Sequence, residues 1–303
     1  MHNDLMSPRT IFLTRITSSA EKAGASLLIE SIQSFGGSMS KYPIWIFTSD
    51  PQIESYQDIV SPQVEIFPIT IPEPLKNFPF ASKVMACAQA EEMTSSGVQS
   101  LVWFDLECLV IQPPLLFELG DQFDAAFRPV HHRNVGLSPA EPLDAFWRGI
   151  YRELGIQDVS LTVESFIGRQ PLRAYFNSHA FSLNPALGLF NRWAEHFQRL
   201  VMDGQFQQTA CPDEKHRIFL FQALLSALVA SSLDSGRIRI LPDIYNYPYN
   251  LHDQVPDGQR PKALNDLVTI TFEGRNLHPN AMTDLEVLGS LRTWLREKIE
   301  ELE

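Results

Sequence analysis

The chain has little cysteine, and it has none of the cysteine or histidine spacings that are typical of structural zinc sites. Cys87, Cys108 and Cys211 are its three cysteines among 303 residues, and an odd number without paired spacing favours a reducing compartment. The sequence also lacks an Asn-x-Ser/Thr glycosylation site. Residues 1–15 lack an apolar run of signal-peptide length, and no segment is apolar over enough residues to cross a bilayer. We therefore expect a cytoplasmic protein.

Positive charge is scarce as well. The chain carries 24 Lys and Arg residues against 36 Asp and Glu residues, for a formal net charge of −12. Proteins that bind nucleic acid need a basic surface that displaces counterions from the phosphates, and the basic residues here are scattered. The composition therefore argues against nucleic acid and a membrane surface as partners. An anionic ligand would need a local cation or a metal ion.

Several common nucleotide-binding and hydrolase motifs are absent. There is no G-x-x-x-x-G-K-[ST], G-x-G-x-x-G, G-x-S-x-G or H-E-x-x-H segment. This argues against a P-loop NTPase, a Rossmann dehydrogenase, an α/β-hydrolase and a zincin. The chain also lacks repeats, low-complexity stretches and a long polar linker, and 44% of its residues are hydrophobic. We therefore expect residues 1–303 to form a single domain.

Hydrophobic periodicity predicts an α/β protein. In the first third, the predicted strands are 10–14, 44–47, 64–69 and 100–104, and the predicted helices are 21–35 and 82–93. Strands that alternate with helices indicate βαβ units and a largely parallel sheet. The less regular remainder predicts strands at 124–127, 175–183, 237–241 and 268–272, and helices at 145–154, 187–202, 213–231 and 284–302.

Two carboxylates, Asp105 and Glu107, follow the predicted strand at 100–104. If the strand conformation continues, residues two apart point to the same side, so both carboxylates face one way. The carboxyl ends of strands are also where open α/β sheets bind ligands. Mg²⁺ and Mn²⁺ prefer oxygen ligands and often bridge to substrate phosphates, so the pair is a candidate metal site. On spacing alone, a turn with two solvated acids explains the pair equally well.

Segment 102–110, with the sequence VWFDLECLV, resembles the D-x-D strand of GT-A-type glycosyltransferases. The resemblance is closest to the glycogenin-like and lipopolysaccharide galactosyltransferase-like group. Other motifs of that group are resembled, in the same order along the chain, at 10–15, 82–83, 175–185, 211–215, 241–246 and 271–274. The resemblance leaves 128–173 and the tail uncovered. It implies a GT-A-like fold, in which a mixed, mostly parallel central sheet is flanked by helices.

The resemblance also implies that different parts of the domain bind the donor and the acceptor. Residues 10–110 would bind the nucleotide sugar, and residues 111–274 would hold the transferred sugar and the acceptor. Residues 275–303 would form a C-terminal helical extension.

A divalent metal is part of what the resemblance implies. Asp105 and Glu107 would hold Mn²⁺ or Mg²⁺ against the diphosphate of the donor, with Glu107 in place of the usual second aspartate. Thr271 stands where the group has a histidine that is a third metal ligand. We expect His278, seven residues later, to replace that histidine.

Three residues of the first third are implied to contact the donor. Thr14 and Arg15, at the end of the first predicted strand, would contact the nucleoside. Lys83, at the start of the helix before the acid pair, would contact the donor phosphates or the sugar. A solvated lysine is the alternative for Lys83, although the helix dipole mildly disfavours a cation at this position.

Four more residues are implied to lie near the transferred sugar. Asn177 and Ser178 match the group's F-N-[SA]-G-[VL] strand, in which the asparagine orients the sugar, and His179 replaces the usual glycine. Asp213 matches an aspartate that contacts the donor sugar or the acceptor, and Glu214 stands where the group has a glutamine. Helix capping by Asp213 is the compatible alternative. Asn177 and Asp213 are therefore the expected catalytic residues.

The resulting hypothesis is a hexosyltransferase. The chain would move a hexose from a nucleotide-diphospho-sugar, by analogy a UDP-sugar, to a glycan, a lipid-linked sugar or a protein. A protein that binds a sugar nucleotide or a glycan without turnover is an alternative, because Glu107 and Thr271 depart from the group's metal ligands. A sugar-phosphate nucleotidyltransferase is a third possibility, but segment 14–20 lacks the glycine-rich loop of those enzymes.

Overall fold

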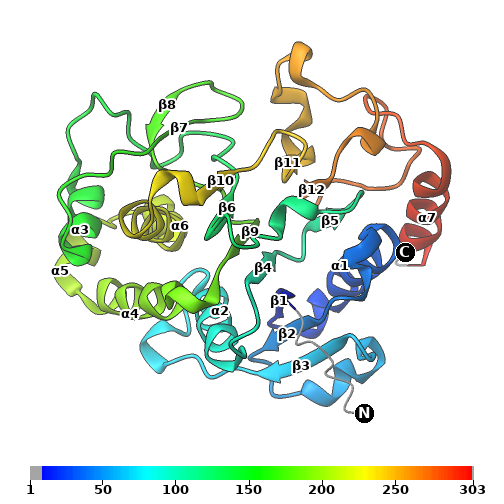
Figure 1. Ribbon diagram of the computed structural model, residues 1–303, viewed down its shortest axis with the longest axis horizontal. Coiled ribbons are helices and arrows are strands. Elements are labelled where there is room, and N and C mark those ends of the chain that lie inside the picture. Colours follow the sequence, from blue (N-terminus) through cyan, green and yellow to red (C-terminus); the bar gives the residue numbers. More distant parts are fainter. Residues whose placement is uncertain (1–8, 302–303) are drawn as a thin grey trace.

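The centre of the molecule is a seven-stranded sheet, and the structure, a computed structural model, describes residues 9–301. In sheet order the strands are β10 (Ile238–Ile240), β6 (Ala125–Phe127), β9 (Ala180–Leu183), β4 (Ser100–Phe104), β1 (Thr10–Ile16), β2 (Ile44–Thr48) and β3 (Val64–Pro68) (Figure 1). Strand β1 pairs in parallel with β2 and β4, β2 with β3, and β10 with β6. Strand β9 runs antiparallel to β4 and β6. The sheet is mixed and mostly parallel, as predicted.

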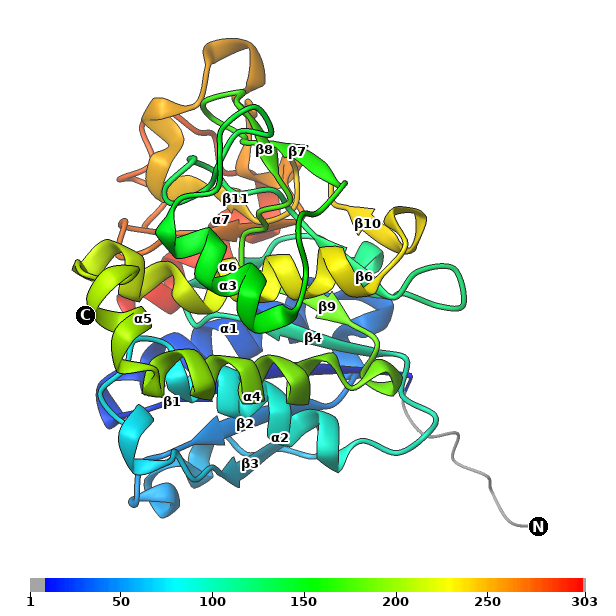
Figure 2. The same cartoon turned by 90° about the vertical axis from the view of Figure 1, so that its left-hand side faces the viewer.

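Helices cover both faces of this sheet (Figures 1 and 2). Helix α1 (Lys22–Phe35) packs on one face. The other face carries α2 (Ala81–Met93), α3 (Ala145–Leu154), α4 (Leu189–Met202) and α6 (Glu214–Ser232), and the short α5 (Gly204–Thr209) follows α4. Helix α7 (Gly289–Glu300) lies beside α1, where the rings of Phe35 and Trp294 meet edge to face at 5.2 Å.

The central strands are apolar throughout because their two faces pack into two different hydrophobic cores. In β1, Ile11 and Leu13 pack with α2, α4 and α6, whereas Phe12 packs with α1. In β4, Trp103 and Val102 alternate in the same way. A strand that is buried on both faces reads as an unbroken apolar run, which explains why these two strands were predicted well. Their parallel pairing brings their carboxyl ends side by side.

A second sheet connects the end of β4 to the C-terminal third. Strand β5 (Cys108–Val110) follows β4 after a three-residue turn and runs antiparallel to β12 (Thr269–Thr271). Strand β12 also pairs in parallel with β11 (Tyr247–Pro248). Strands β7 (Thr162–Glu164) and β8 (Pro171–Arg173) form a separate antiparallel pair. Within residues 9–301, no helix combines the length and the apolar character that a bilayer span requires.

The strand predicted over 175–183 is shorter in the structure and begins at Ala180. The register with β6 breaks before Ala180, because the N–H of Asn177 donates to the carbonyl of Arg128 at 2.8 Å, out of step with the pairing of Ser182 and Ala126. The N–H of Phe176 donates to the hydroxyl of Ser226 in α6 at 2.9 Å. This segment therefore contacts α6 and forms a separate antiparallel bridge, Pro129 to Phe176, beyond the end of β6.

The helix predicted over 284–302 begins late, at Gly289. Residues before it pair with a distant segment, since the N–H of Leu264 donates to the carbonyl of Glu286 at 2.7 Å. Leu285 and Val287 are buried in the core beneath α7, so their apolar character reflects packing of an extended segment.

Candidate functional site

A cavity of about 450 Å³ opens where β1 and β4 end, at the carboxyl edge of the parallel strands. Loops from several elements converge there, and open α/β sheets bind ligands at this edge. The lining residues are Arg15, Ala20, Glu21, Gly24, Phe80, Asp105, Leu106, Glu107, His179, Phe272 and Glu273. We call this space the first cavity.

Asp105 and Glu107 reach the first cavity from a turn. Strand β4 ends one residue before Asp105, and the N–H of Cys108 donates to the carbonyl of Asp105 at 3.0 Å, which closes the turn. The prediction that an unbroken strand aligns the two carboxylates is therefore wrong, because residues 105–107 leave the sheet. Both residues nevertheless line the cavity.

Lys83 lies beneath Asp105 and neutralises it. The side chain of Lys83 comes from the first turn of α2 and is fully buried. Its Nζ lies 2.9 Å from each carboxylate oxygen of Asp105 and donates to the carbonyl of Ser178 at 2.6 Å. The Nε1 of Trp103 donates to Asp105 Oδ1 at 2.8 Å. Burial alone would raise the pKa of Asp105, but Lys83 and then His179 lower it below the usual range of a carboxyl group.

The burial of Lys83 argues against both of its predicted roles, direct contact with the donor and a solvated lysine. Three aromatic rings surround the ammonium, with centroids 5.1 Å (Trp103), 5.3 Å (Phe221) and 5.9 Å (Phe181) from Nζ. Burial lowers the pKa of Lys83 from its ordinary value, and the carboxylate of Asp105 opposes this shift. The alternative of a solvated lysine is wrong. Lys83 does not line the cavity, so it holds Asp105 instead of reaching a ligand directly.

His179 bridges two carboxylates at the inner wall of the cavity. Its Nδ1 lies 3.1 Å from Asp105 Oδ2, and its Nε2 lies 3.0 Å from Glu273 Oε1. Burial alone would lower the pKa of His179, but the two carboxylates raise it to about 9. The pairing with His179 in turn lowers the pKa of Glu273. The ring is therefore a cation at neutral pH.

Arg15 and Glu107 complete the charged lining. The Nη1 of Arg15 lies 3.5 Å from Glu21 Oε1. Burial, followed by the carboxylate of Glu273, raises the pKa of Glu107. Thr14 is buried in the sheet and does not line the cavity, so only Arg15 of the predicted nucleoside pair reaches it.

A second cavity, of about 160 Å³, lies on the other side of the bridge made by His179 and Glu273. These two residues line both cavities. Asn177 lines the second cavity, and its Oδ1 accepts from Asn246 Nδ2 at 2.6 Å and from the N–H of His179 at 2.8 Å. The other lining residues are Val130, His131, His132, Asn134, Phe219, Gln222, Asn250, Leu251 and Thr271.

His131 offers unused polar atoms to the second cavity. Its side chain is buried, and neither ring nitrogen has a hydrogen-bond partner among the described residues. Burial, followed by the charge of Arg128, lowers the pKa of His131 well below its usual range, so the ring is neutral. A neutral imidazole donates from one nitrogen and accepts at the other, which suits a ligand with hydroxyl groups.

Most of the non-glycine residues with a strained, positive-φ backbone lie around the two cavities. Within residues 9–301, five non-glycine residues have positive φ. Phe80, Asn134 and Glu273 line the cavities, and Asn246 bonds to Asn177; Arg169 is the fifth. Such conformations cost about 1–3 kcal/mol each and concentrate at ligand-binding sites. Their distribution therefore supports a binding role for this region.

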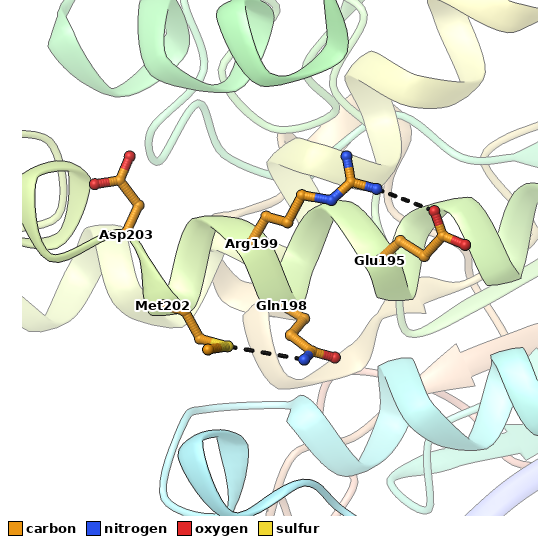
Figure 3. Close-up of a pocket in the computed structure, with 5 residues that line it drawn as sticks. All are labelled: Glu195, Gln198, Arg199, Met202 and Asp203. Atoms are coloured by element: carbon orange, nitrogen blue, oxygen red, sulfur yellow. Dashed lines mark hydrogen bonds and ion pairs between the residues drawn. The ribbon is translucent and has the colours of Figure 1, made fainter.

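Another hollow, of about 550 Å³, lies on the outer surface of α4 and is lined by Glu195, Gln198, Arg199, Met202 and Asp203 (Figure 3). The interactions drawn there join residues one turn apart on the same helix, such as Arg199 with Glu195. Its lining residues all come from α4 and the residue that follows it, so it is a weaker candidate than the paired cavities, where side chains from several elements meet.

Comparison with known proteins identifies the fold. No family model and no curated protein sequence matches the chain. Among solved structures, the galactosyltransferase LgtC in complex with donor and acceptor sugar analogs is 12% identical, with a TM-score of 0.54 over 96% of this chain and 94% of that one. The chain has a GT-A-like fold. The bifunctional glycosyltransferase WbbM is 12% identical, with a TM-score of 0.53 over 98% of this chain and 53% of its own.

GlyE from Streptococcus pneumoniae is a third similar glycosyltransferase, with 11% identity and a TM-score of 0.50 over 96% of this chain and 60% of its own. The GT-A-like fold predicted from the sequence motifs is thus confirmed over nearly the whole chain. At these identities the likeness establishes the fold alone, so the chemistry of the site has to be argued from its side chains.

The side chains of this GT-A-like site do not fit the divalent metal that the resemblance implied. The carboxylate of Asp105 already accepts from Lys83 and Trp103, and the ring of His179 lies against it. A divalent ion at Asp105 would have two cations as neighbours. Across residues 9–301, no three His, Cys, Asp or Glu side chains are grouped to hold a metal ion. The predicted replacement of the third ligand by His278 also fails, because His278 lines neither cavity. Thr271, at the position of the family's histidine, is buried and donates to Asn246 Oδ1 at 2.5 Å.

Three predicted site residues lie elsewhere in the fold. Asp213 is the N-cap of α6: its Oδ1 accepts from the N–H of His216 at 2.9 Å, and the exposed Glu214 follows it. Gln222 of the same helix, which lines the second cavity, is nine residues further on, about 13 Å along the axis. Neither acid lines a cavity, so this placement supports the capping alternative. His278 also lines neither cavity, since its Nε2 lies 3.8 Å from a glutamate of α7.

Four residues of the site were not predicted: Glu273, Asn246, Gln222 and His131. Gln222 accepts a hydrogen bond from Ser178 Oγ at 2.8 Å. A single amide in the middle of an apolar helix was the available signal for it. Glu273 and Asn246 lie inside segments that resembled family motifs, but their partners are long-range and no local pattern reveals them.

Proposed function

We propose that the chain is a glycosyltransferase that binds a nucleotide-diphospho-sugar in the first cavity and passes its hexose to an acceptor. The observation that carries this proposal is the charged cavity at the carboxyl ends of β1 and β4 in a GT-A-like fold. Its lining also carries the carboxylates of Glu21, Asp105, Glu107 and Glu273. The cationic side chains Arg15 and His179 are therefore the groups at which a diphosphate would bind.

The second cavity would receive the sugar or the acceptor. It adjoins the first cavity through His179 and Glu273, and it presents Asn177 and the unpaired ring of His131. Polar groups of this kind suit sugar hydroxyls, which both donate and accept hydrogen bonds. The Mn²⁺ or Mg²⁺ implied by the sequence resemblance has no part in the proposal, because Asp105 is already paired with Lys83.

Ligand-dependent thermal stability tests the proposal without knowledge of the acceptor. A ligand that binds the native state raises the unfolding midpoint by mass action. We expect one member of a panel of UDP-, GDP- and dTDP-sugars to raise the midpoint equally with EDTA and with Mn²⁺, and to release nucleoside diphosphate on incubation. The Arg15→Gln variant should lose the shift, whereas Arg199→Gln, on the outer surface of α4, should keep it. A panel without any shift at millimolar ligand would contradict donor binding.

Binding without turnover is the second candidate. It is favoured by the pairing of Asp105, whose carboxylate already faces Lys83, Trp103 and His179, so it is not a free ligand for a metal that would stabilise a leaving diphosphate. This alternative predicts a midpoint shift with a nucleotide sugar but no release of nucleoside diphosphate, with or without Mn²⁺. The same panel therefore separates the two candidates.

A further inference from the structure

The ring of His179 lies between carboxylates from two distant parts of the chain. Asp105 follows β4, and Glu273 lies two residues after β12. One ring nitrogen lies within 3.1 Å of the first carboxylate, and the other lies 3.0 Å from the second. The side chain of His179 is a quarter exposed and borders both cavities.

Two further carboxylates belong to the lining: Glu107, and Glu21, which pairs with Arg15. Glu107 lines the first cavity with Asp105 and Glu273, and these groups interact electrostatically. Lys83 compensates Asp105 from the buried side, but it does not reach Glu273 or the cavity surface. Without the ring, the carboxylates would face one another across solvent-filled space.

We propose that the ring of His179 occupies the place of a divalent cation in this cavity: it joins Asp105 to Glu273, balances their charge and keeps metal ions out. Mg²⁺ takes oxygen ligands at about 2.1 Å and usually retains several waters. An ion with such a hydration shell cannot share the gap with the ring. This inference goes beyond the proposed function, because it rests on side-chain placement and its test needs neither donor nor acceptor.

Removal of the ring should therefore create a metal site. We expect titration of Mn²⁺, followed by the electron paramagnetic resonance signal of the free ion, to show no binding to the wild-type chain at millimolar concentration. His179→Ala should bind one Mn²⁺ with an affinity raised by about tenfold or more over the wild type. The gain should disappear in His179→Ala/Glu273→Gln. His278→Ala, which removes a histidine remote from both cavities, should behave as the wild type.

Two outcomes would overturn the inference. The first is Mn²⁺ binding by the wild-type chain that is lost in Asp105→Asn, since the ring would then not exclude metal. The second is equal, weak Mn²⁺ binding by the wild type and the His179 variants, since exclusion would then have another cause. His179→Gln, which retains a polar side chain of similar size, replaces His179→Ala if circular dichroism shows that the alanine variant is unfolded. A failed metal test leaves the donor-binding measurement unaffected, so the two proposals stand or fall separately.

Discussion

Lys83 and Asp105 form an ion pair in which both carboxylate oxygens lie 2.9 Å from an ammonium group that is wholly buried. The pair fastens the first turn of α2 to the end of β4, and the carbonyl of Ser178 accepts a further hydrogen bond from the same ammonium. Three segments that border the cavities are thus held by one nitrogen atom. Loss of either partner leaves an uncompensated charge in a poorly solvated place.

We expect Lys83→Met to destabilise the fold by roughly 3–5 kcal/mol, because it leaves the Asp105 carboxylate without its buried cation. The double variant Lys83→Met/Asp105→Asn should cost clearly less than the sum of the two single variants. Urea unfolding followed by circular dichroism measures these differences. Lys76→Met is a matched control, since the exposed Lys76 pairs with Glu73 at the surface, where such pairs contribute about 0–1 kcal/mol. A similar loss for Lys76→Met and Lys83→Met would contradict the role assigned to the buried pair.

Stability should depend on pH through His179. Its pKa is raised to about 9 in the folded state by Asp105 and Glu273, with Lys83 and Glu107 the other charged groups nearby, and an ordinary histidine has a pKa of about 6.5. A group that binds its proton more tightly when folded contributes fully below about pH 6.5, and this contribution is lost as the pH rises through about 9. The free energy of unfolding should therefore decline more steeply from about pH 7 to pH 10 in the wild type than in His179→Gln. Parallel profiles would show that the ring is not charged in the folded state.

Glu91 of α2 should be important for the start of α4. Its carboxylate accepts from the backbone N–H groups of Phe190 at 3.1 Å and Asn191 at 2.8 Å, and from Asn191 Nδ2 at 2.8 Å. These N–H groups lie in the first turn of α4, which lacks a side-chain cap of its own. Glu91→Ala should cost about 1–3 kcal/mol because it leaves buried donors unsatisfied. Glu92→Ala, at the exposed neighbouring position, should change the unfolding midpoint little. Equal effects of the two changes would contradict the capping role.

The parts of the fold that could be predicted from the sequence are those that local patterns specify. Strand β4 and helix α3 were predicted with their observed bounds, because an unbroken apolar run and a helical apolar spacing need no distant partner. Short strands such as β5 and β11 were missed, since two or three residues carry no periodicity and their pairing partner β12 is far along the chain.

In the candidate site, too, residues within local motifs could be predicted, whereas pairings between distant segments could not. Asp105, Glu107, Arg15 and Asn177 were predicted from local motifs and do line the cavities. Their partners were not foreseen. The bridge from His179 to Glu273 joins residues 94 positions apart, and its existence depends on the packing of β12 against β5. Resemblance to a family suggests which positions lie at a site, but it does not reveal which charges meet there.

The contact between α3 and α5 depends on Gly149, and the substitution of alanine, which adds one methyl group, tests this dependence. A Cβ added at Gly149 would meet the ring carbons Cε2 and Cδ2 of Phe206, which is itself buried. Alanine is favoured over glycine in a helix by roughly 1 kcal/mol, whereas overpacking a core typically costs 1–3 kcal/mol. The steric term is the larger, so we expect Gly149→Ala to destabilise the fold.

Two further variants separate the gain in helix propensity from the steric cost of overpacking. Gly204→Ala, in the first turn of α5, adds a Cβ with no heavy atom within 4 Å, so it should be neutral or slightly stabilising. Gly149→Ala/Phe206→Leu should recover part of the loss, because the smaller side chain leaves room for the methyl group. Thermal or urea unfolding of the set provides the measurement. A Gly149→Ala variant that is more stable than the wild type would show that the Phe206 ring moves aside at little cost, and that helix propensity decides the outcome at this contact.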